Sequence, residues 1–127
     1  MIKFSKQREA IRIYLDKNIV HPTADEVYEH VRREFPNISL ATVYRNLNQL
    51  AEMGDIQKLG FAGFPDHYDF ETKQHAHFLC RKCGKVYDLG ADFDEFITDA
   101  VKTKAPGRIE SCTLDFNGVC TSCDEMA

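Results

Sequence analysis

The chain has 127 residues, 43% of them hydrophobic and 28% charged, with a net charge of −4. This length allows one or two small lobes with thin cores. No segment is apolar enough to cross a membrane, and residues 1–7 lack the apolar region of a signal peptide. We therefore expect a cytoplasmic protein in a reducing environment, where thiols bind metals rather than form disulfides.

The charge is uneven along the chain. Residues 1–60 hold nine Lys and Arg against eight Asp and Glu, whereas residues 61–127 hold seven against twelve. The overall acidity argues against general binding to nucleic acid, but a nearly neutral N-terminal half with a local basic face is compatible with DNA binding. The acidic half suits divalent cations.

Hydrophobic spacing predicts two helices at the start of the chain. The first begins near Ser5 and ends at residues 17–18, with Ile11, Tyr14 and Leu15 on one face. The second follows Thr23, which forms a capping-box pattern with Glu26. Its inward-facing residues are expected to be Val27, Val31 and Phe35, and its end to be set by Pro36.

A third helix is predicted for residues 39–53, before Gly54, which suits the residue after a helix. Its buried stripe is expected to be Val43, Leu47 and Leu50. Strands are predicted at residues 56–59 and 67–70, around a turn region at 60–65. Three short helices and a two-stranded ribbon predict a winged helix-turn-helix, with the third helix reading DNA.

Polar side chains on another face of the third helix are of the types that hydrogen-bond base edges and phosphates. Composition alone does not distinguish a DNA-binding face from an ordinary solvated face. The order of the predicted helices and strands favours DNA binding. Lys3 and two other basic residues near the N-terminus are candidates for phosphate contacts. The predicted DNA-binding set is Thr42, Tyr44, Arg45, Asn46, Gln49, Lys6 and Arg8.

A polar hinge at residues 71–74 divides the chain in this prediction. Residues 1–72 are expected to form the winged-helix DNA-binding domain, and residues 73–127 a small α/β dimerisation and zinc-binding domain, giving an α+β fold. In the second domain we expect a return strand at 85–89, a helix at 92–104 and further strand within 108–119. Its edge and apolar faces suit pairing with a second copy.

Two Cys-x-x-Cys pairs, Cys80/Cys83 and Cys120/Cys123, predict one tetrahedral zinc site. The inner cysteines are separated by 36 residues, enough for a small subdomain that the metal holds at both ends. The fifth cysteine, Cys112, has no near partner and is expected to be a small buried hydrophobic residue.

A second site of nitrogen and oxygen ligands is predicted beside the cysteines. Side chains alternate along a strand, so His75 and His77 point the same way and Cys80 the other. Asp69 and Asp88 flank the histidines in sequence, and His21 stands before the second helix. A mixed His/Asp site suits iron, manganese or zinc. Ordinary surface histidines are the alternative.

Four segments, 21–28, 41–47, 75–84 and 120–123, resemble motifs of the ferric uptake regulator (Fur) superfamily, and the resemblance covers nearly the whole chain. It implies a homodimeric, metal-dependent transcription factor, usually a repressor, on inverted-repeat operator DNA. It also implies structural Zn²⁺ on the four paired cysteines. The regulatory metal would bridge the lobes, held by His21, Asp69, His75, His77 and Asp88.

The aspartates at positions 69 and 88 resemble the peroxide-sensing branch, PerR, because iron-sensing members commonly carry glutamates there. By that analogy the regulatory metal is Fe²⁺ or Mn²⁺, and peroxide oxidises His21 or His75 in the iron form. An iron, manganese or zinc uptake regulator without peroxide sensing is the alternative.

Two interpretations of other classes remain at this point. A His/Asp site with an open position would activate water in a zinc hydrolase, but the sequence shows no additional general base. A zinc-stabilised protein-interaction module would have no DNA target. We expect no enzymatic activity.

Overall fold

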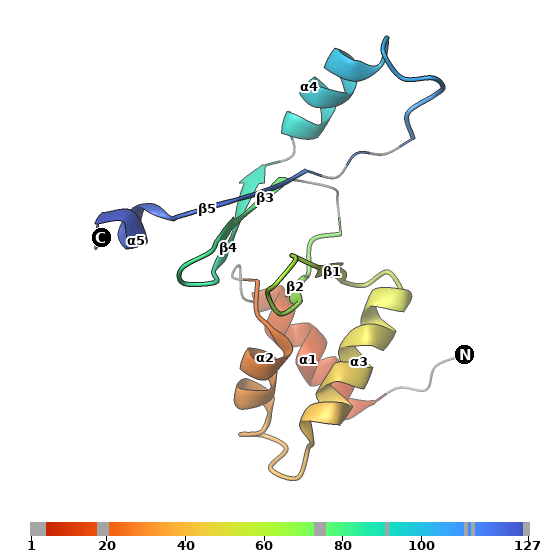
Figure 1. The fold of residues 1–127 in the computed structure, drawn as a ribbon. Coiled ribbons are helices and arrows are strands. Elements are labelled where there is room, and N and C mark those ends of the chain that lie inside the picture. Colours follow the sequence, from red (N-terminus) through yellow and green to blue (C-terminus); the bar gives the residue numbers. More distant parts are fainter. Residues whose placement is uncertain are drawn as a thin grey trace. The chain divides into compact units, whose positions relative to one another are not determined.

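The computed structural model describes residues 5–17, 21–72, 76–90, 92–110, 112 and 114–125 (Figure 1). The chain divides into two compact units, Met1–Thr72 and Lys73–Ala127. The first is helical with a small two-stranded sheet, and the second contains a mixed sheet, which confirms the predicted α+β class. In the part of the chain that is described, none of the helices has the length and hydrophobicity of a transmembrane segment.

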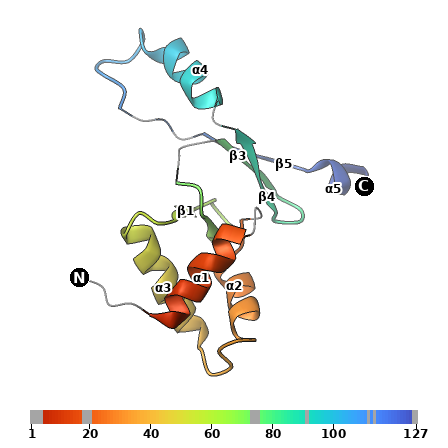
Figure 2. The ribbon, with the colours of Figure 1, turned by 180° about the vertical axis from the view of Figure 1, so that it is seen from behind.

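Three helices form the core of the N-terminal unit: α1 (Lys6–Lys17), α2 (Ala24–Val31) and α3 (Leu40–Glu52). Within this unit α1 lies behind α2 and α3 in Figure 1 and in front of them in Figure 2. Their inward faces share one hydrophobic cluster in which Ile11, Val27 and Leu47 are completely buried. The helical spacing of apolar residues in the sequence accounts for this packing.

The start of α2 follows the predicted capping box. Thr23 Oγ1 accepts a hydrogen bond from the Glu26 backbone N–H at 3.3 Å, and a Glu26 carboxylate oxygen accepts one from the Thr23 N–H at 3.4 Å. These bonds satisfy two backbone donors that the helix leaves without partners.

The end of α2 differs from the prediction. The helix stops at Val31, and residues 32–34 form turns in which Arg33 and Glu34 donate to carbonyls only three residues back. The Phe35 N–H still donates to the Val31 carbonyl four residues back, at 2.9 Å, but Pro36 has no N–H to continue the series. Phe35 is still partly buried against the core.

The third helix and the ribbon agree closely with the prediction. Ser39 caps α3, and Gly54 takes a φ of +82° after it. Strand β1 (Gln57–Leu59) pairs antiparallel with β2 (His67–Asp69), each one residue shorter than predicted. Gly63, at a φ of +83°, lies in the turn between them, where other residues would be strained.

The C-terminal unit is built on a three-stranded sheet in the order β4-β3-β5. The central strand β3 (Ala76–Cys80) pairs antiparallel with β4 (Val86–Gly90) and parallel with β5 (Asp115–Gly118). Helix α4 (Asp92–Val101) lies between β4 and β5 in sequence, and α5 (Thr121–Glu125) ends the described chain.

Three details of this unit correct the prediction. Helix α4 ends at Val101, before the predicted residue 104, in a turn where Lys104 donates to Val101. Of the described residues in 108–119, only 115–118 form a strand, because β5 pairs with β3 only over His77–Cys80. The single turn of α5 was not predicted, since it has no buried residue to give a periodic signal.

The capping box gives a test of the fold. We expect Thr23→Ala to lower the free energy of unfolding by about 0.5–2 kcal/mol, because the Glu26 N–H loses its acceptor. Urea denaturation followed by circular dichroism measures this change. Thr23→Ser keeps the hydroxyl and should stay near the wild type; equal losses in both variants would contradict the capping role.

Candidate metal centres and DNA-binding surface

The four paired cysteines converge in the C-terminal unit. Their sulfur atoms all lie within 4.8 Å of one another. Cys80 ends β3, and Cys120 comes shortly after β5. Because β3 and β5 are parallel, their carboxyl ends meet at the same edge of the sheet. Gly84, at a φ of +76°, turns the chain after the first pair.

Backbone donors favour the thiolate form in this cluster. The N–H groups of Cys120 and Cys83 point at Cys80 Sγ from 3.3 and 3.4 Å, and they lower the pKa of Cys80 to about 6. The backbone N–H of Cys123 lowers the pKa of Cys120. A hydrogen bond to the Cys120 sulfur raises the pKa of Cys123 to about 12. Four clustered sulfurs, two of them with backbone donors, fit Zn²⁺.

In the N-terminal unit His21 lies against Asp69. Pro22 accepts a hydrogen bond from the Tyr68 N–H at 2.9 Å, and Thr23 forms an antiparallel bridge with His67. Continuing this register places His21 opposite Asp69. The imidazole Nε2 lies 3.1 Å from Asp69 Oδ2, and the two side chains are 3% and 9% exposed.

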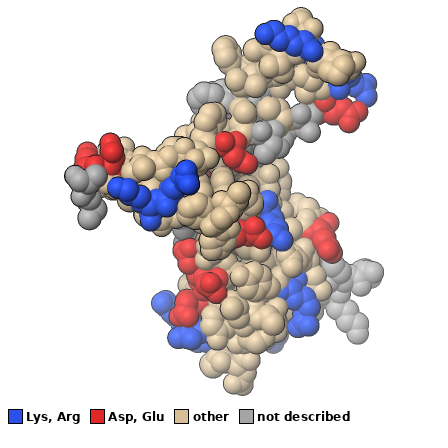
Figure 3. Space-filling model, in the orientation of Figure 1, with Lys and Arg blue, Asp and Glu red and all other residues tan. Residues whose placement is uncertain are grey.

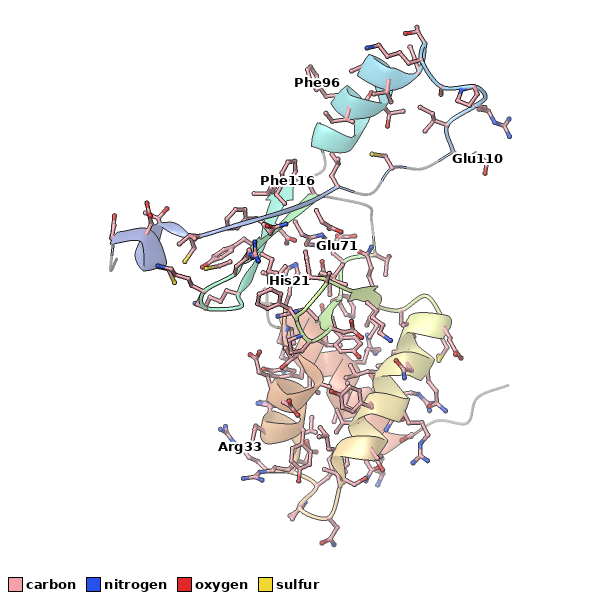
Figure 4. All side chains as sticks on the ribbon, in the orientation of Figure 1. His21, Arg33, Glu71, Phe96, Glu110 and Phe116 are labelled. Atoms are coloured by element: carbon pink, nitrogen blue, oxygen red, sulfur yellow. The ribbon has the colours of Figure 1, made fainter. Side chains whose placement is uncertain are left out.

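Asp69 has a second partner in the same unit. Its Oδ1 accepts a hydrogen bond from the Glu71 N–H at 3.0 Å, which fixes the orientation of the carboxylate. Figure 4 labels His21 and Glu71 and shows the side chains around these two residues. A buried imidazole beside a held carboxylate is an arrangement typical of metal ligands.

The C-terminal unit carries a similar pair. His77 on β3 and Asp88 on β4 are cross-strand partners, with His77 Nε2 3.3 Å from Asp88 Oδ1. His77 is almost fully buried, whereas Asp88 is half-exposed. Because β3 continues to Cys80, strand alternation puts His77 and Cys80 on opposite faces. His75, the remaining predicted ligand, lies outside the described residues.

Each pair offers an imidazole nitrogen and a carboxylate oxygen. This donor set suits iron, manganese and zinc, and it is poor for soft metals. The chemistry of the residues therefore fits the metals that the sequence predicted for the regulatory site.

The exposed arc of α3 differs in part from the predicted one. Tyr44 is 41% exposed, and Arg45 and Asn48 are exposed as well. Asn46 was predicted to face DNA but is buried, at 6% exposure. It stands three residues after Val43 and so falls beside the buried stripe. Asn48, four residues after Tyr44, is on the exposed face and was not among the predicted contacts.

Four of the predicted DNA-contact residues form hydrogen bonds with one another within the N-terminal unit. Gln49 Oε1 accepts a hydrogen bond from Arg8 Nη1 at 3.4 Å, and Thr42 accepts one from Arg45. Lys6 is exposed at the start of α1, and Lys3 lies outside the described residues. On the face of the N-terminal unit seen in Figure 3, acidic and basic side chains are interspersed. Among the described residues, this face therefore shows no uniform basic patch.

Apolar side chains are exposed on the C-terminal unit. Phe96 on α4 is 71% exposed and Phe116 on β5 is 43% exposed, and both are labelled in Figure 4. Tyr87, Leu89 and Val119 are each about 40% exposed. Phe78, Tyr87, Leu89 and Val119 also line a shallow pocket beside Cys120. Such a surface suits contact with another apolar surface.

Residues 1–117 match the ferric uptake regulator family. The chain belongs to this family. The peroxide-responsive repressor PerR of Staphylococcus epidermidis is 33% identical over 124 residues, which cover 98% of this chain and 83% of that protein. The Fur-family fold and a role as a metal-dependent transcription regulator, not an enzyme, agree with the predictions from sequence.

Solved structures of Fur-family proteins share the fold. The Helicobacter pylori ferric uptake regulator Fur, for which three functional metal-binding sites are described, has a TM-score of 0.87 at 27% identity, covering 97% of this chain and 83% of its own. The Campylobacter jejuni peroxide stress regulator has a TM-score of 0.75 at 30% identity, covering 92% and 88%. The likeness extends over both units of the chain.

The cysteine cluster gives a test of metal dependence. If the cluster holds zinc and the C-terminal unit pairs with a second copy, we expect Cys80→Ser to lose both, because a small unit gains folding free energy from such a metal. Metal analysis and light scattering measure both effects. Cys112→Ser is the matched control, since Cys112 lies outside the cluster. A stable metal-free dimer of Cys80→Ser would argue against the role.

Proposed function

We propose that the protein is a homodimeric, peroxide-responsive repressor that binds inverted-repeat operator DNA when a regulatory metal is bound. The metal is Fe²⁺ or Mn²⁺, and its ligands are His21, Asp69, His75, His77 and Asp88. A structural Zn²⁺ is held by Cys80, Cys83, Cys120 and Cys123. The observation that carries the proposal is the His–Asp contact found in each unit.

The division of ligands between the units explains metal dependence. The pair His21/Asp69 belongs to the unit with α3, and His77/Asp88 belongs to the unit with the cysteine cluster. A metal that uses both pairs favours one orientation of the units over others. If that orientation spaces the two α3 helices of a dimer for successive major grooves, metal and DNA stabilise each other's binding.

Two features support peroxide sensing. Both carboxylate ligands are aspartates, as in the branch that the sequence resembles, and the Staphylococcus epidermidis relative is a peroxide-responsive repressor. Bound ferrous iron would supply the redox chemistry. One oxygen atom of hydrogen peroxide is added to a ligand imidazole and the other leaves as water, so the histidine loses two electrons and the peroxide gains two. His21 and His75 are the candidates for oxidation.

The exposed apolar side chains support dimerisation through the C-terminal unit. Phe116 stands on β5, an edge strand of the sheet, and Phe96 stands on α4. A second copy of the chain would cover these side chains and pair or shield the edge.

His21→Ala tests the regulatory site. We expect the variant to keep its fold and zinc but to lose metal-dependent DNA binding, because the regulatory metal loses the imidazole ligand that lies beside Asp69. The measurement is a mobility shift on duplexes selected by the wild type from an inverted-repeat library, with and without Mn²⁺. His30→Ala, at an exposed histidine of the same unit, is the control. Equal affinity of the wild type with and without metal would refute the proposal.

Peroxide sensing is tested separately. Under anaerobic conditions, we expect the Fe²⁺ form to release DNA when hydrogen peroxide is added and the Mn²⁺ form to stay bound. Mass spectrometry should then locate a single added oxygen on His21 or His75 of the iron form only. Metal-dependent binding that peroxide leaves intact would instead favour an iron, manganese or zinc uptake regulator.

A further inference from the structure

Lys58 lies where β1 meets the reading helix. Its Nζ is 3.5 Å from the Asn48 carboxamide oxygen on α3 and 3.6 Å from Asp66 Oδ2 in the turn before β2. Asn48 is exposed and stands one helical turn after Tyr44. Lys58 on the ribbon therefore lies beside the exposed face of α3.

The sheet fixes the position of Lys58. It is the cross-strand partner of Tyr68, whose hydroxyl is buried. The contacts of Lys58 with Asn48 and Asp66 bring together the exposed face of α3, the ribbon and the residue before β2.

The sequence makes Lys58 unusual. Between Arg45 and Lys73 it is the only Lys or Arg in the chain. If the ribbon supplies a side-chain cation to a DNA phosphate, Lys58 is the residue that supplies it. In the free protein its charge faces Asp66, and the two side chains are 44% and 42% exposed.

The energetics allow an exchange of partners. An exposed ion pair contributes little to stability, so separating Lys58 from Asp66 costs little. A lysine that moves to a phosphate releases a condensed counterion and strengthens binding to DNA. Asp66 then stays near the phosphates and repels them.

We infer that Lys58 is a DNA phosphate contact, and that Asp66 competes with DNA for it and so limits operator affinity. The inference rests on the proposed DNA-binding function. It assigns Lys58 to the surface that contacts DNA. Asp66 then affects operator affinity only through its ion pair with Lys58. Asn48 positions the lysine by accepting its hydrogen bond.

Salt dependence tests the inference. We measure operator binding of the Mn²⁺ form over a range of salt concentrations, on the duplex selected by the wild type. Lys58→Ala removes one contact from each protomer of the dimer, so it should reduce the slope of log K against log [salt] by about 1.8 and weaken binding severalfold. Asp66→Asn should strengthen binding severalfold, and this gain should disappear in the Lys58→Ala background. Circular dichroism and thermal melting should match the wild type for each variant.

Lys102→Ala is the matched control, because Lys102 forms a similarly exposed pair with Asp99 at 3.7 Å in the other unit. It should leave the slope unchanged. Metal-dependent binding by the wild type, together with an unchanged slope in Lys58→Ala, would overturn this inference alone. An equal loss of slope in Lys102→Ala would also overturn it, by showing an effect of net charge. A gain from Asp66→Asn that persists without Lys58 would refute the competition.

Discussion

The short antiparallel contact between residues 21–23 and β2 determines the geometry of the N-terminal unit. Thr23 bridges to β2 through its backbone while its side chain begins α2. The same contact brings His21 opposite Asp69, whose other oxygen is held by the Glu71 N–H. A shift of one residue in this register would turn His21 to the other face. The capping box and the candidate metal ligands are therefore parts of one local arrangement.

Both units contain a histidine–aspartate pair, but they build it from different elements. In one, an irregular segment pairs with a ribbon strand; in the other, two regular strands pair, and each places a histidine beside an aspartate. A cross-strand pair on a rigid ladder holds its two side chains at little additional entropic cost. If one metal uses both pairs, the free energy of joining the units comes from coordination and depends on which metal the cell supplies.

Short local patterns in the sequence predicted much of the structure. The capping box, the glycine after α3 and the paired cysteines are short-range patterns with few alternatives, and the structure has them as predicted. Asn46 shows where residue type misleads. It was assigned to the polar face by its chemistry, although its helical position lies next to the buried stripe. The extent of β5 depends on the length of its partner β3, which is a tertiary property that local sequence does not contain.

The parallel pairing of β3 with β5 has a consequence for synthesis and folding. The two cysteine pairs enclose 36 residues, and ordering a loop of this length costs about 4 kcal/mol in the chain-entropy model of a crosslink. Such non-local pairing forms slowly, and the second cysteine pair leaves the ribosome after the rest of the sheet. Until β5 is made, one edge of β3 has no partner in the sheet. If the cysteine cluster holds zinc, as proposed, a shortage of zinc would lower the yield of soluble protein through aggregation of newly made chains.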